Sequence, residues 1–266
     1  MSSEARSGHH IGQWGRAAAA LHRRGYGLWR EHSDAINLAL IARWLDRSAD
    51  GRALKTDLFD EAVGRGLCAD TRWRLPRLLG MDLSVDVVRR AALGTPGLRG
   101  AAADVRELPF ADGAFETVLS ISTLDHFEST AEITHSLREI RRVLRPGGLL
   151  LLTLDNPANP KIRLRNALPW SLLRRTGLVP YFIGRSVGPG RLRRELMSAG
   201  FTVLEVGAIV HCPRVLAVAA SRLGVFAKPR ARRRLLGVLR RFEVLERWPT
   251  RFLTAHFTAV LARWDP

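Results

Sequence analysis

Cysteine is scarce in this 266-residue sequence, which contains only Cys68 and Cys212. The two lie far apart and form neither a Cys-x-x-Cys pair nor a disulfide framework, so a fold held together by disulfide bonds is excluded. Isolated cysteines of this kind are usually small buried side chains. We expect that role for both of them, in a reducing compartment.

Long apolar segments and metal-ligand clusters are also missing. No run of about 18 uncharged apolar residues occurs, and the N-terminal residues MSSEARSGHHIGQW lack the short apolar core of a secretory signal. The histidines are scattered without carboxylates at ligand spacing, and neither a Ser/His/Asp elbow nor a phosphate-binding loop is present. The sequence therefore predicts a cytoplasmic protein without a metal site.

Lysine is rare, with only Lys55, Lys161 and Lys228 in the sequence. Arginine therefore supplies nearly all of the positive charge behind the net charge of +17. Residues 1–156 carry 21 Lys and Arg against 20 Asp and Glu, whereas residues 157–266 carry 21 against 5. A genome biased toward arginine codons would explain the preference for arginine but not this asymmetry. The C-terminal part is therefore where a nucleic acid or an anionic membrane would bind.

What the sequence does contain is an alternation of short apolar runs with helical segments from residue 51 onward. The runs are ALKTDLF, RLLGMDLS, GLRGAAADV, FETVLSIST and GGLLLLTLD, and segments 84–93 and 130–144 between them suit helices. This alternation predicts βαβ units around a parallel sheet, and the uninterrupted run LLLLTL is typical of a strand covered on both faces. The last strand, HFTAVLARW, is expected to pair antiparallel with FTVLEVGAIVH.

Four regions are expected within one α/β domain. Residues 1–50 are predicted to form helices that cover the ligand site, and residues 51–155 the ligand-binding core. Residues 156–190, which contain five prolines, are expected to form a cap. Residues 191–266 complete the sheet and carry a basic helical insertion at 213–248.

Polar side chains stand at the expected C-terminal ends of four strands, where the ligand site of an open α/β sheet lies. They are Thr56-Asp57, Asp82, Asp104 and Ser120–Ser122. An acid at the position of Asp82 can accept two hydrogen bonds from a ribose diol, and its competing interpretation is an N-cap for the next helix. Asp104 has the same ambiguity and can receive an adenine amino group.

The series GMDLS, ADVRELPFADGAFETVLS and LREIRRVLRPGGLLLLTL resembles the class I S-adenosylmethionine-dependent methyltransferases of the methyltransferase-11 type over residues 54–155. The resemblance implies a doubly wound, mostly parallel seven-stranded sheet of the Rossmann-like kind with an antiparallel last strand. It implies S-adenosylmethionine as the cofactor, with Asp82 on the ribose hydroxyls and with Asp104 and Val105 reading adenine. Ser120 and Ile121 would line the end of the fourth strand near the methyl group.

The first glycine-rich loop departs from this family pattern. Relatives place an acidic residue and several glycines after the first strand, whereas this sequence has LKTDLFDEA at 54–62. Asp57, or one of Asp60 and Glu61, is expected to accept from the cofactor's ammonium, and Lys55 to sit in a structural ion pair; the alternative is a degenerate cofactor pocket. The expected cofactor-binding residues are Thr56, Asp57, Leu58, Phe59, Glu61, Asp82, Leu83, Asp104, Val105, Ser120 and Ile121.

Residues 122–127, STLDHF, lie just past the fourth strand and over the expected methyl position. His126 is the first candidate for a base or an acceptor-orienting group, with Asp125 fixing its tautomer. The competing interpretation is that His126 serves packing or local hydrogen bonding. Tyr181 and His211 are weaker candidates, for which we expect structural roles.

The segment RARRRLLGVLRRFEVLER predicts a basic amphipathic helix with Leu235, Val238, Phe242 and Leu245 on one face. One interpretation is a lid helix packed on the domain with solvated arginines. A second is peripheral contact with an anionic membrane through residues 230–247. Binding of RNA is disfavoured because no RNA-binding module or aromatic platform accompanies the arginines.

The leading functional hypothesis is S-adenosylmethionine-dependent methyl transfer to a small-molecule or lipid-like acceptor in biosynthesis. Methyl transfer is an in-line displacement, so alignment of the acceptor can supply much of the acceleration. Two alternatives stand beside it. One is an enzyme that binds S-adenosylmethionine without methylating, and the other is a non-catalytic binding protein on the same fold.

Overall fold

The computed structural model describes residues 14–19, 27–45, 51–71, 75–169, 186–214 and 229–266, together with residues 173, 184 and 216. Tyr181, which the sequence analysis considered as a weaker candidate, lies outside the described residues. So does much of the expected cap between residues 170 and 185.

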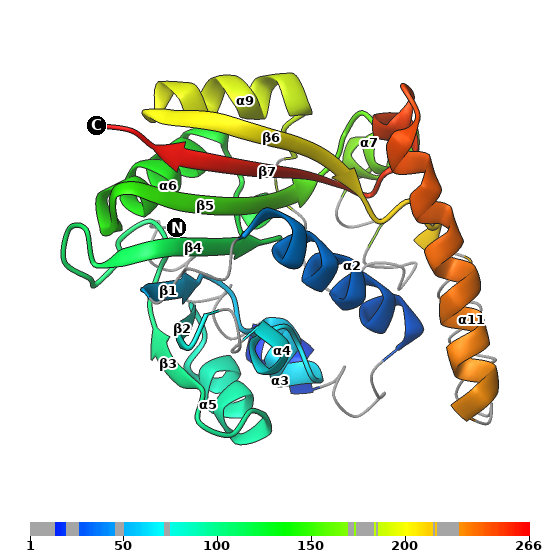
Figure 1. The fold of residues 1–266 in the computed structure, drawn as a ribbon, viewed down its shortest axis with the longest axis horizontal. Helices are drawn as coiled ribbons and strands as arrows, with labels where there is room; N and C mark the ends of the chain where they lie inside the picture. The colour runs from blue at the N-terminus through cyan, green and yellow to red at the C-terminus, as the bar shows by residue number, and fades with distance from the viewer. Residues whose placement is uncertain are drawn as a thin grey trace.

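One sheet of seven strands runs through the molecule in the order β3-β2-β1-β4-β5-β7-β6 (Figure 1). The strands are β1 (Arg52–Lys55), β2 (Arg77–Asp82), β3 (Arg99–Ala102), β4 (Phe115–Ile121), β5 (Leu144–Asp155), β6 (Phe201–Ile209) and β7 (Phe257–Trp264). Strands β1 to β5 pair in parallel, and β7 lies between β5 and β6, antiparallel to both. The predicted doubly wound, mostly parallel sheet with an antiparallel last strand is confirmed.

Helices cover both faces of this sheet. They are α2 (Leu28–Trp44), α3 (Phe59–Val63), α4 (Cys68–Thr71), α5 (Val85–Gly94), α6 (Thr130–Val143), α7 (Pro160–Ala167), α9 (Pro189–Ser198), α11 (Pro229–Arg241) and α12 (Arg251–Thr254), with short 3-10 turns η1 (Leu124–His126) and η2 (Phe242–Arg247). Helices α2, α3 and α5 pack on one face, and α6 and α9 pack on the other (Figure 1).

The core divides into two layers because neighbouring strand residues point to opposite faces of the sheet. Ala53 and Leu151 belong to the layer under α2 and α5, whereas Leu54 and Leu150 belong to the layer under α6 and α9. The leucines of β5 at 150–152 and 154 are fully buried. The strand predicted to be covered on both faces is therefore covered on both.

Helix α6 begins with a capping box, in which the Ser129 hydroxyl accepts from the Glu132 amide and the Glu132 carboxylate accepts from the Ser129 amide. The helix ends at Val143, close to the predicted end. Strand β5 follows without a loop, so Pro146-Gly147-Gly148 lies inside the strand. Gly147 has a φ of +77°, which relieves the local bend at little steric cost.

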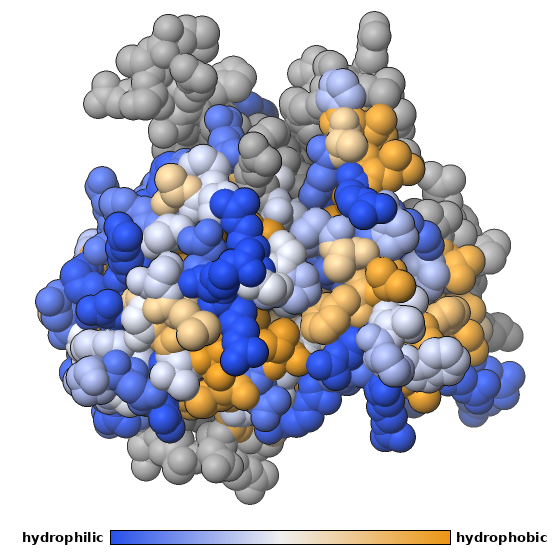
Figure 2. Space-filling view, turned by 90° about the horizontal axis from the view of Figure 1, so that it is seen from above, coloured by the Kyte–Doolittle hydropathy of each residue, from blue (hydrophilic) through white to orange (hydrophobic). Residues whose placement is uncertain are grey.

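Helix α11 packs against α2 on the side of the molecule toward which the arrowheads of β4 and β5 point (Figure 1). Its buried side chains are Leu236 and Leu239, whereas Val238 is 51% exposed. The predicted apolar face was therefore wrong at Val238. Arg232 pairs with Glu31 of α2, which attaches the basic helix to the domain. Figure 2 shows hydrophobic side chains in the lower centre and on the right of this face, interspersed with hydrophilic ones.

Candidate active site

The C-terminal ends of β1, β2 and β4 carry polar side chains that the sequence placed at strand ends, and Asp104 follows β3. A cavity of about 170 Å³ lies at the C-terminal ends of β4 and β5, lined by residues of α2, α3, β4, η1, β5, α7 and the start of β7. Ser122, Asp125 and His126 line it, as predicted for the segment after the fourth strand. Helix α2 contributes Asp34 and Asn37, and β5 contributes Asp155.

Asp82 joins the end of β2 to the first loop. Its carboxylate oxygens accept from the Leu58 amide at 3.2 Å and from the Ser84 amide at 2.9 Å. Burial and the neighbouring Asp57 carboxylate raise the pKa of Asp82 to about 7. Since a carboxylate has about four acceptor positions, two hydrogen bonds leave capacity for a ribose diol. Ser84, and not Asp82, is the N-cap residue of α5.

The end of β1 is organised by a buried ion pair between Lys55 and Glu61. Lys55 Nζ lies 2.9 Å from Glu61 Oε2 and also donates to the Asp57 carbonyl. Glu61 Oε1 accepts from the amides of Leu67 and Cys68. The predicted structural ion pair of Lys55 is thus present, and it turns the Glu61 carboxylate into the interior, away from any ligand.

The two other acids of this loop differ in their partners. Asp60 pairs with Arg30 of α2. Asp57 accepts from the Phe59 amide at 3.1 Å and lies 3.8 Å from Lys55 Nζ, and its side chain remains 19% exposed. Of the three acids considered from the sequence, Asp57 is therefore the one with acceptor capacity toward a ligand.

Leu58 and Phe59 occupy the turn in which relatives have glycines, and both side chains are buried. A Cβ at Gly80 of β2 would overlap the Leu58 side chain, so this glycine provides the space that Leu58 fills. Phe59 contacts the ring of Trp14, with centroids 5.5 Å apart. The Thr56 hydroxyl lies 2.9 Å from that of Thr123. The bulk of the altered loop is therefore packed inward.

Asp104 has an intramolecular partner that the sequence did not suggest. Arg106 binds it through Nη2 at 2.6 Å and also binds Glu132 at 2.7 Å. The Asp104 side chain is 26% exposed, and Val105 beside it is buried. Leu83, after the end of β2, is half-buried. Arg106 therefore lies where Asp104 and Val105 are expected to contact adenine.

The end of β4 leads directly into η1. Ser120 and Ile121 are buried, and Ser122 has a φ of +51°, a conformation that is uncommon for a residue with a side chain. Asp125 Oδ2 accepts from the Asp155 amide at 3.2 Å. Its Oδ1 lies 3.7 Å from His126 Nε2, too far for the hydrogen bond that would fix the histidine tautomer. That predicted bond is not formed in the structure.

His126 packs edge-on against Trp14, with ring centroids 4.7 Å apart. The packing role that we weighed against catalysis is thus present, and the ring also lines the cavity. His211 is buried, with Nδ1 2.7 Å from the Thr254 hydroxyl and Nε2 2.9 Å from the Ala208 carbonyl. This arrangement is the structural role expected for His211.

Sequence reasoning missed an ionic cluster at the end of β5. Asp155 Oδ2 lies 2.6 Å from Arg165 Nη2, and Asp155 Oδ1 lies 3.5 Å from His256 Nε2. Burial lowers the pKa of His256 to about 4, which keeps the ring neutral near pH 7. Asp155 ends the run GGLLLLTLD, so the strand-end rule would have found it. No comparable sequence signal marks the residues of α2.

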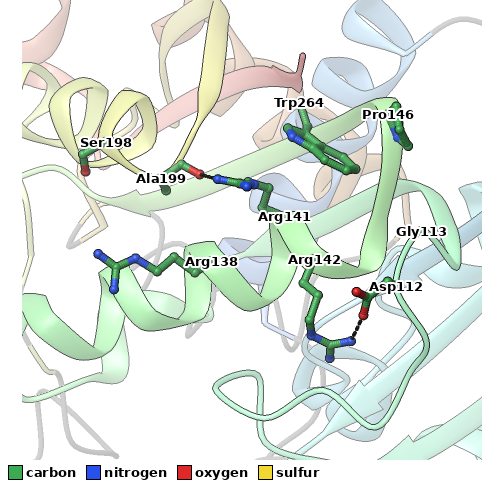
Figure 3. A pocket seen from close by; sticks show the side chains of 9 residues that line it. All are labelled: Asp112, Gly113, Arg138, Arg141, Arg142, Pro146, Ser198, Ala199 and Trp264. Carbon is green, nitrogen blue, oxygen red and sulfur yellow. Dashed lines mark hydrogen bonds and ion pairs between the residues drawn. The ribbon is translucent and has the colours of Figure 1, made fainter. Parts of the chain in front are cut away.

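A second cavity, of about 580 Å³, lies at the opposite end of the sheet (Figure 3). It is lined by the end of α6, the loop before β4 and Trp264 of β7. Arg142 points toward Asp112, and Arg141 points toward the Ala199 carbonyl. Because ligand sites of open α/β sheets lie at the C-terminal strand ends, the smaller cavity is the candidate catalytic site.

Within the described part of the chain, no group of three or more His, Cys, Asp and Glu side chains is placed to hold a metal ion. The helices of that part include none that is long and apolar enough to cross a membrane. Cys68 and Cys212 are both buried as free cysteines, which is the role expected for them.

Comparisons with known proteins agree with this geometry. The model of a methyltransferase domain family matches residues 59–152. A probable S-adenosylmethionine-dependent methyltransferase of Mycobacterium tuberculosis is 25% identical over 62% of this chain and 55% of its own length. A demethylmenaquinone methyltransferase of Beutenbergia cavernae is 31% identical over 47% of this chain and 46% of its own length. The chain therefore spans about half the length of these curated relatives.

Solved structures share the same fold. A Thermotoga maritima S-adenosylmethionine-dependent methyltransferase, described as a possible histamine N-methyltransferase, superposes with a TM-score of 0.62 at 15% identity. The match covers 96% of this chain and 99% of that one. Residues 59–152 thus match a methyltransferase domain, and the fold is that of class I methyltransferases. The predicted fold is confirmed, and the predicted family and cofactor agree with the relatives, which are named as S-adenosylmethionine-dependent enzymes.

The residues of this methyltransferase domain fit the cofactor of its class. Asp82 retains acceptor capacity at the end of β2, and Asp57 retains it at the end of β1. Leu58, which stands where a glycine is usual, is accommodated by the space above Gly80. The two acids can therefore receive the ribose hydroxyls and the ammonium of one molecule that lies across the ends of β1 and β2.

Proposed function

We propose that this chain transfers the methyl group of S-adenosylmethionine to a small-molecule or lipid-like acceptor. The observation that carries the proposal is Asp82, which lies within the matched residues 59–152 and is held by the amides of Leu58 and Ser84. In this proposal Asp82 binds the ribose diol, Asp57 binds the ammonium, and Ser120 and Ile121 border the reacting methyl. When bound, the cofactor supplies an electrophilic methyl group.

The chain's own residues then position the acceptor. The cavity beside Ser122 and Asp125 is adjacent to the end of β4, so an acceptor bound there faces the expected methyl position. Alignment of two reactants at close range supplies a large part of the acceleration of such a displacement. Thr56 and Leu83 would line the cofactor pocket at the ends of β1 and β2.

Isothermal titration calorimetry with S-adenosylmethionine and S-adenosylhomocysteine tests this function. We expect both to bind, and Asp82→Asn to weaken both by more than about tenfold, because a hydrogen-bonded buried acid contributes more than about 1.4 kcal/mol. Failure of both to bind at millimolar concentration would refute the enzyme hypothesis and its non-methylating alternative. Binding of both without methyl transfer to any acceptor class would favour that alternative.

We also propose that the protein is cytoplasmic and contacts anionic membrane surfaces through α11 and η2. The exposed arginines of this segment are Arg230, Arg233, Arg234, Arg240, Arg241 and Arg247. Val238, Val244 and Trp248 are more than half exposed beside them. Exposed cations next to apolar side chains suit an anionic lipid surface, and tryptophan is favoured at the membrane interface. This contact would bring a lipid-like acceptor to the cavity.

A further inference from the structure

Three buried acceptor atoms in the cavity beside α2 have no hydrogen-bond partner among the described residues. They are Asp34 Oδ2, Asn37 Oδ1 and Asp125 Oδ1. Their residues are only 7%, 5% and 3% exposed, and all three line the cavity. Buried polar atoms in native proteins nearly always have partners, and an amide oxygen and two ionised carboxylates accept hydrogen bonds. The missing partner is therefore a group rich in hydrogen-bond donors, such as an ammonium.

The carboxylates around the cavity divide into paired and unpaired ones. Asp60 pairs with Arg30, and Asp155 pairs with Arg165 at 2.6 Å. Asp34 has Lys55 as its nearby cation, but that lysine is committed to Glu61. Among the described residues, Asp125 has only His126 within ion-pair range, at 3.7 Å. Burial raises the pKa of Asp34 to about 7 and that of Asp125 to about 6, so this part of the cavity gains its full negative charge when a cation binds there.

Arg214 provides the opposite charge in the same cavity. Its guanidinium lies over the ring of Trp29, 5.9 Å from the centroid, and forms no ion pair with a described residue. The volume of about 170 Å³ is close to the roughly 150 Å³ that accommodates one benzene molecule. A ligand of roughly six to ten heavy atoms fits such a space.

We propose that this cavity binds a small zwitterionic acceptor, with its amine on Asp34, Asn37 and Asp125 and its anionic group on Arg214. The inference rests on the proposed methyl transfer and assigns its acceptor class. The acceptor is either a free amino acid-like molecule or the amine head group of a lipid. In both cases the methylated atom is nitrogen.

The chemistry requires a proton acceptor at the amine. An ammonium has no lone pair, so it must first give one proton to a carboxylate, here that of Asp125. The nitrogen lone pair then forms the new N–C bond while the electrons of the breaking S–C bond stay on sulfur. The product leaves as a methylammonium, and the Asp125 proton passes to solvent.

Calorimetry in the absence of cofactor tests the acceptor class with four probes. β-Alanine and phosphoethanolamine carry an amine and an anion, propylamine carries only the amine, and propionate carries only the anion. We expect at least one zwitterion to bind about tenfold or more tightly than either half-molecule. Asp125→Asn, which keeps an acceptor for the Asp155 amide, should weaken the amine-bearing probes but not propionate. Arg214→Gln should weaken the anion-bearing probes but not propylamine.

Arg138→Gln, in the distant cavity of Figure 3, is the matched control and should change none of these affinities. Vesicles of phosphatidylcholine with and without phosphatidylethanolamine identify the source of the amine. Tighter binding of the wild type, but not of Asp125→Asn, to the vesicles that contain phosphatidylethanolamine would indicate a lipid head group. Equal affinity for zwitterions and half-molecules, or unchanged zwitterion affinity in Asp125→Asn, would overturn the inference. The same samples are also titrated with S-adenosylhomocysteine. If they bind it, only the acceptor inference fails, whereas loss of this binding as well would mean that the proposed function fails.

Discussion

Lys55 Nζ and Glu61 Oε2 lie 2.9 Å apart in a fully buried ion pair at the end of β1. The pair stands in the loop where relatives have an acidic residue and glycines. Because Glu61 also accepts from the backbone amides of Leu67 and Cys68 at the start of α4, the pair closes the loop onto the domain. The loop is thus held by charge and packing, and no glycine-rich turn is needed for it.

Removal of one partner of this pair should be costly. We expect Glu61→Gln to lower the free energy of unfolding by about 3–5 kcal/mol, because it leaves the Lys55 charge buried without its main partner. Lys55→Met combined with Glu61→Gln should recover part of that loss. Urea denaturation monitored by circular dichroism measures both effects.

The exposed pair Arg65–Asp70, 2.6 Å apart in the same segment, is the matched control. Arg65→Gln should cost less than about 1 kcal/mol, because the arginine is 71% exposed and water screens the interaction. A loss in Glu61→Gln no larger than that in Arg65→Gln would contradict the structural role of the buried pair.

The sequence predicted the fold well because its signals are local. Strand-end acids such as Asp82 follow apolar runs, and the continuous leucines of β5 show burial on both faces. The partners of these acids are not local. Arg106 on Asp104 follows from loop geometry, and Asp34 reaches the site only because α2 packs across the strand ends. Periodicity describes such a helix but does not say what it covers.

The exposed face of α11 shows the same limit. An apolar stripe spaced at helical intervals predicts Val238 on the buried face, but the helix rotates so that Leu236 and Leu239 face the domain. The ion pair between Arg232 and Glu31, a residue 201 positions away, contributes to that rotation. Long-range pairs of this kind decide which of two similar faces is buried.

Asp57 and Asp60 give a matched test of the ammonium site. Asp57→Asn should weaken S-adenosylhomocysteine binding by about tenfold, because a charge-assisted hydrogen bond is lost. Asp60→Asn should have a small effect, because Asp60 is paired with Arg30. Methylthioadenosine, which lacks the amino acid part, should bind both variants like the wild type. Equal losses for both ligands in Asp57→Asn would instead indicate a general disturbance of the loop.

The pH dependence of stability should reveal Asp34. Burial, and next the charge of Glu61, raise its pKa from 3.8 to about 7. The folded state therefore binds more protons than the unfolded state between these values, and the contribution of Asp34 to stability is lost as the pH rises through that window. Asp34→Asn should match the wild type near pH 4 and exceed its stability by a few kcal/mol near pH 8.

The difference between variant and wild type is the quantity to measure, because His256 has an opposite effect. Its pKa is lowered to about 4, so its contribution to stability increases as the pH rises toward 6.5. Urea denaturation of both proteins at several pH values isolates Asp34, because His256 contributes equally to each. A difference that is constant from acid to neutral pH would show that Asp34 does not titrate in this window.

Vesicle flotation tests the membrane contact with two variants of equal charge. Replacement of Arg233, Arg234, Arg240 and Arg241 by Gln should reduce binding to phosphatidylglycerol vesicles by more than about tenfold, since each basic residue near such a surface contributes about 1 kcal/mol. The control replaces Arg77, Arg89, Arg90 and Arg99, which are exposed around β2, α5 and β3 at the opposite edge of the sheet (Figure 1). Because both variants lose the same charge, only a localised contact distinguishes them. An equal loss of vesicle binding in both variants would show that the binding depends on net charge alone. Arg232 is left intact because its ion pair with Glu31 holds α11 on the domain.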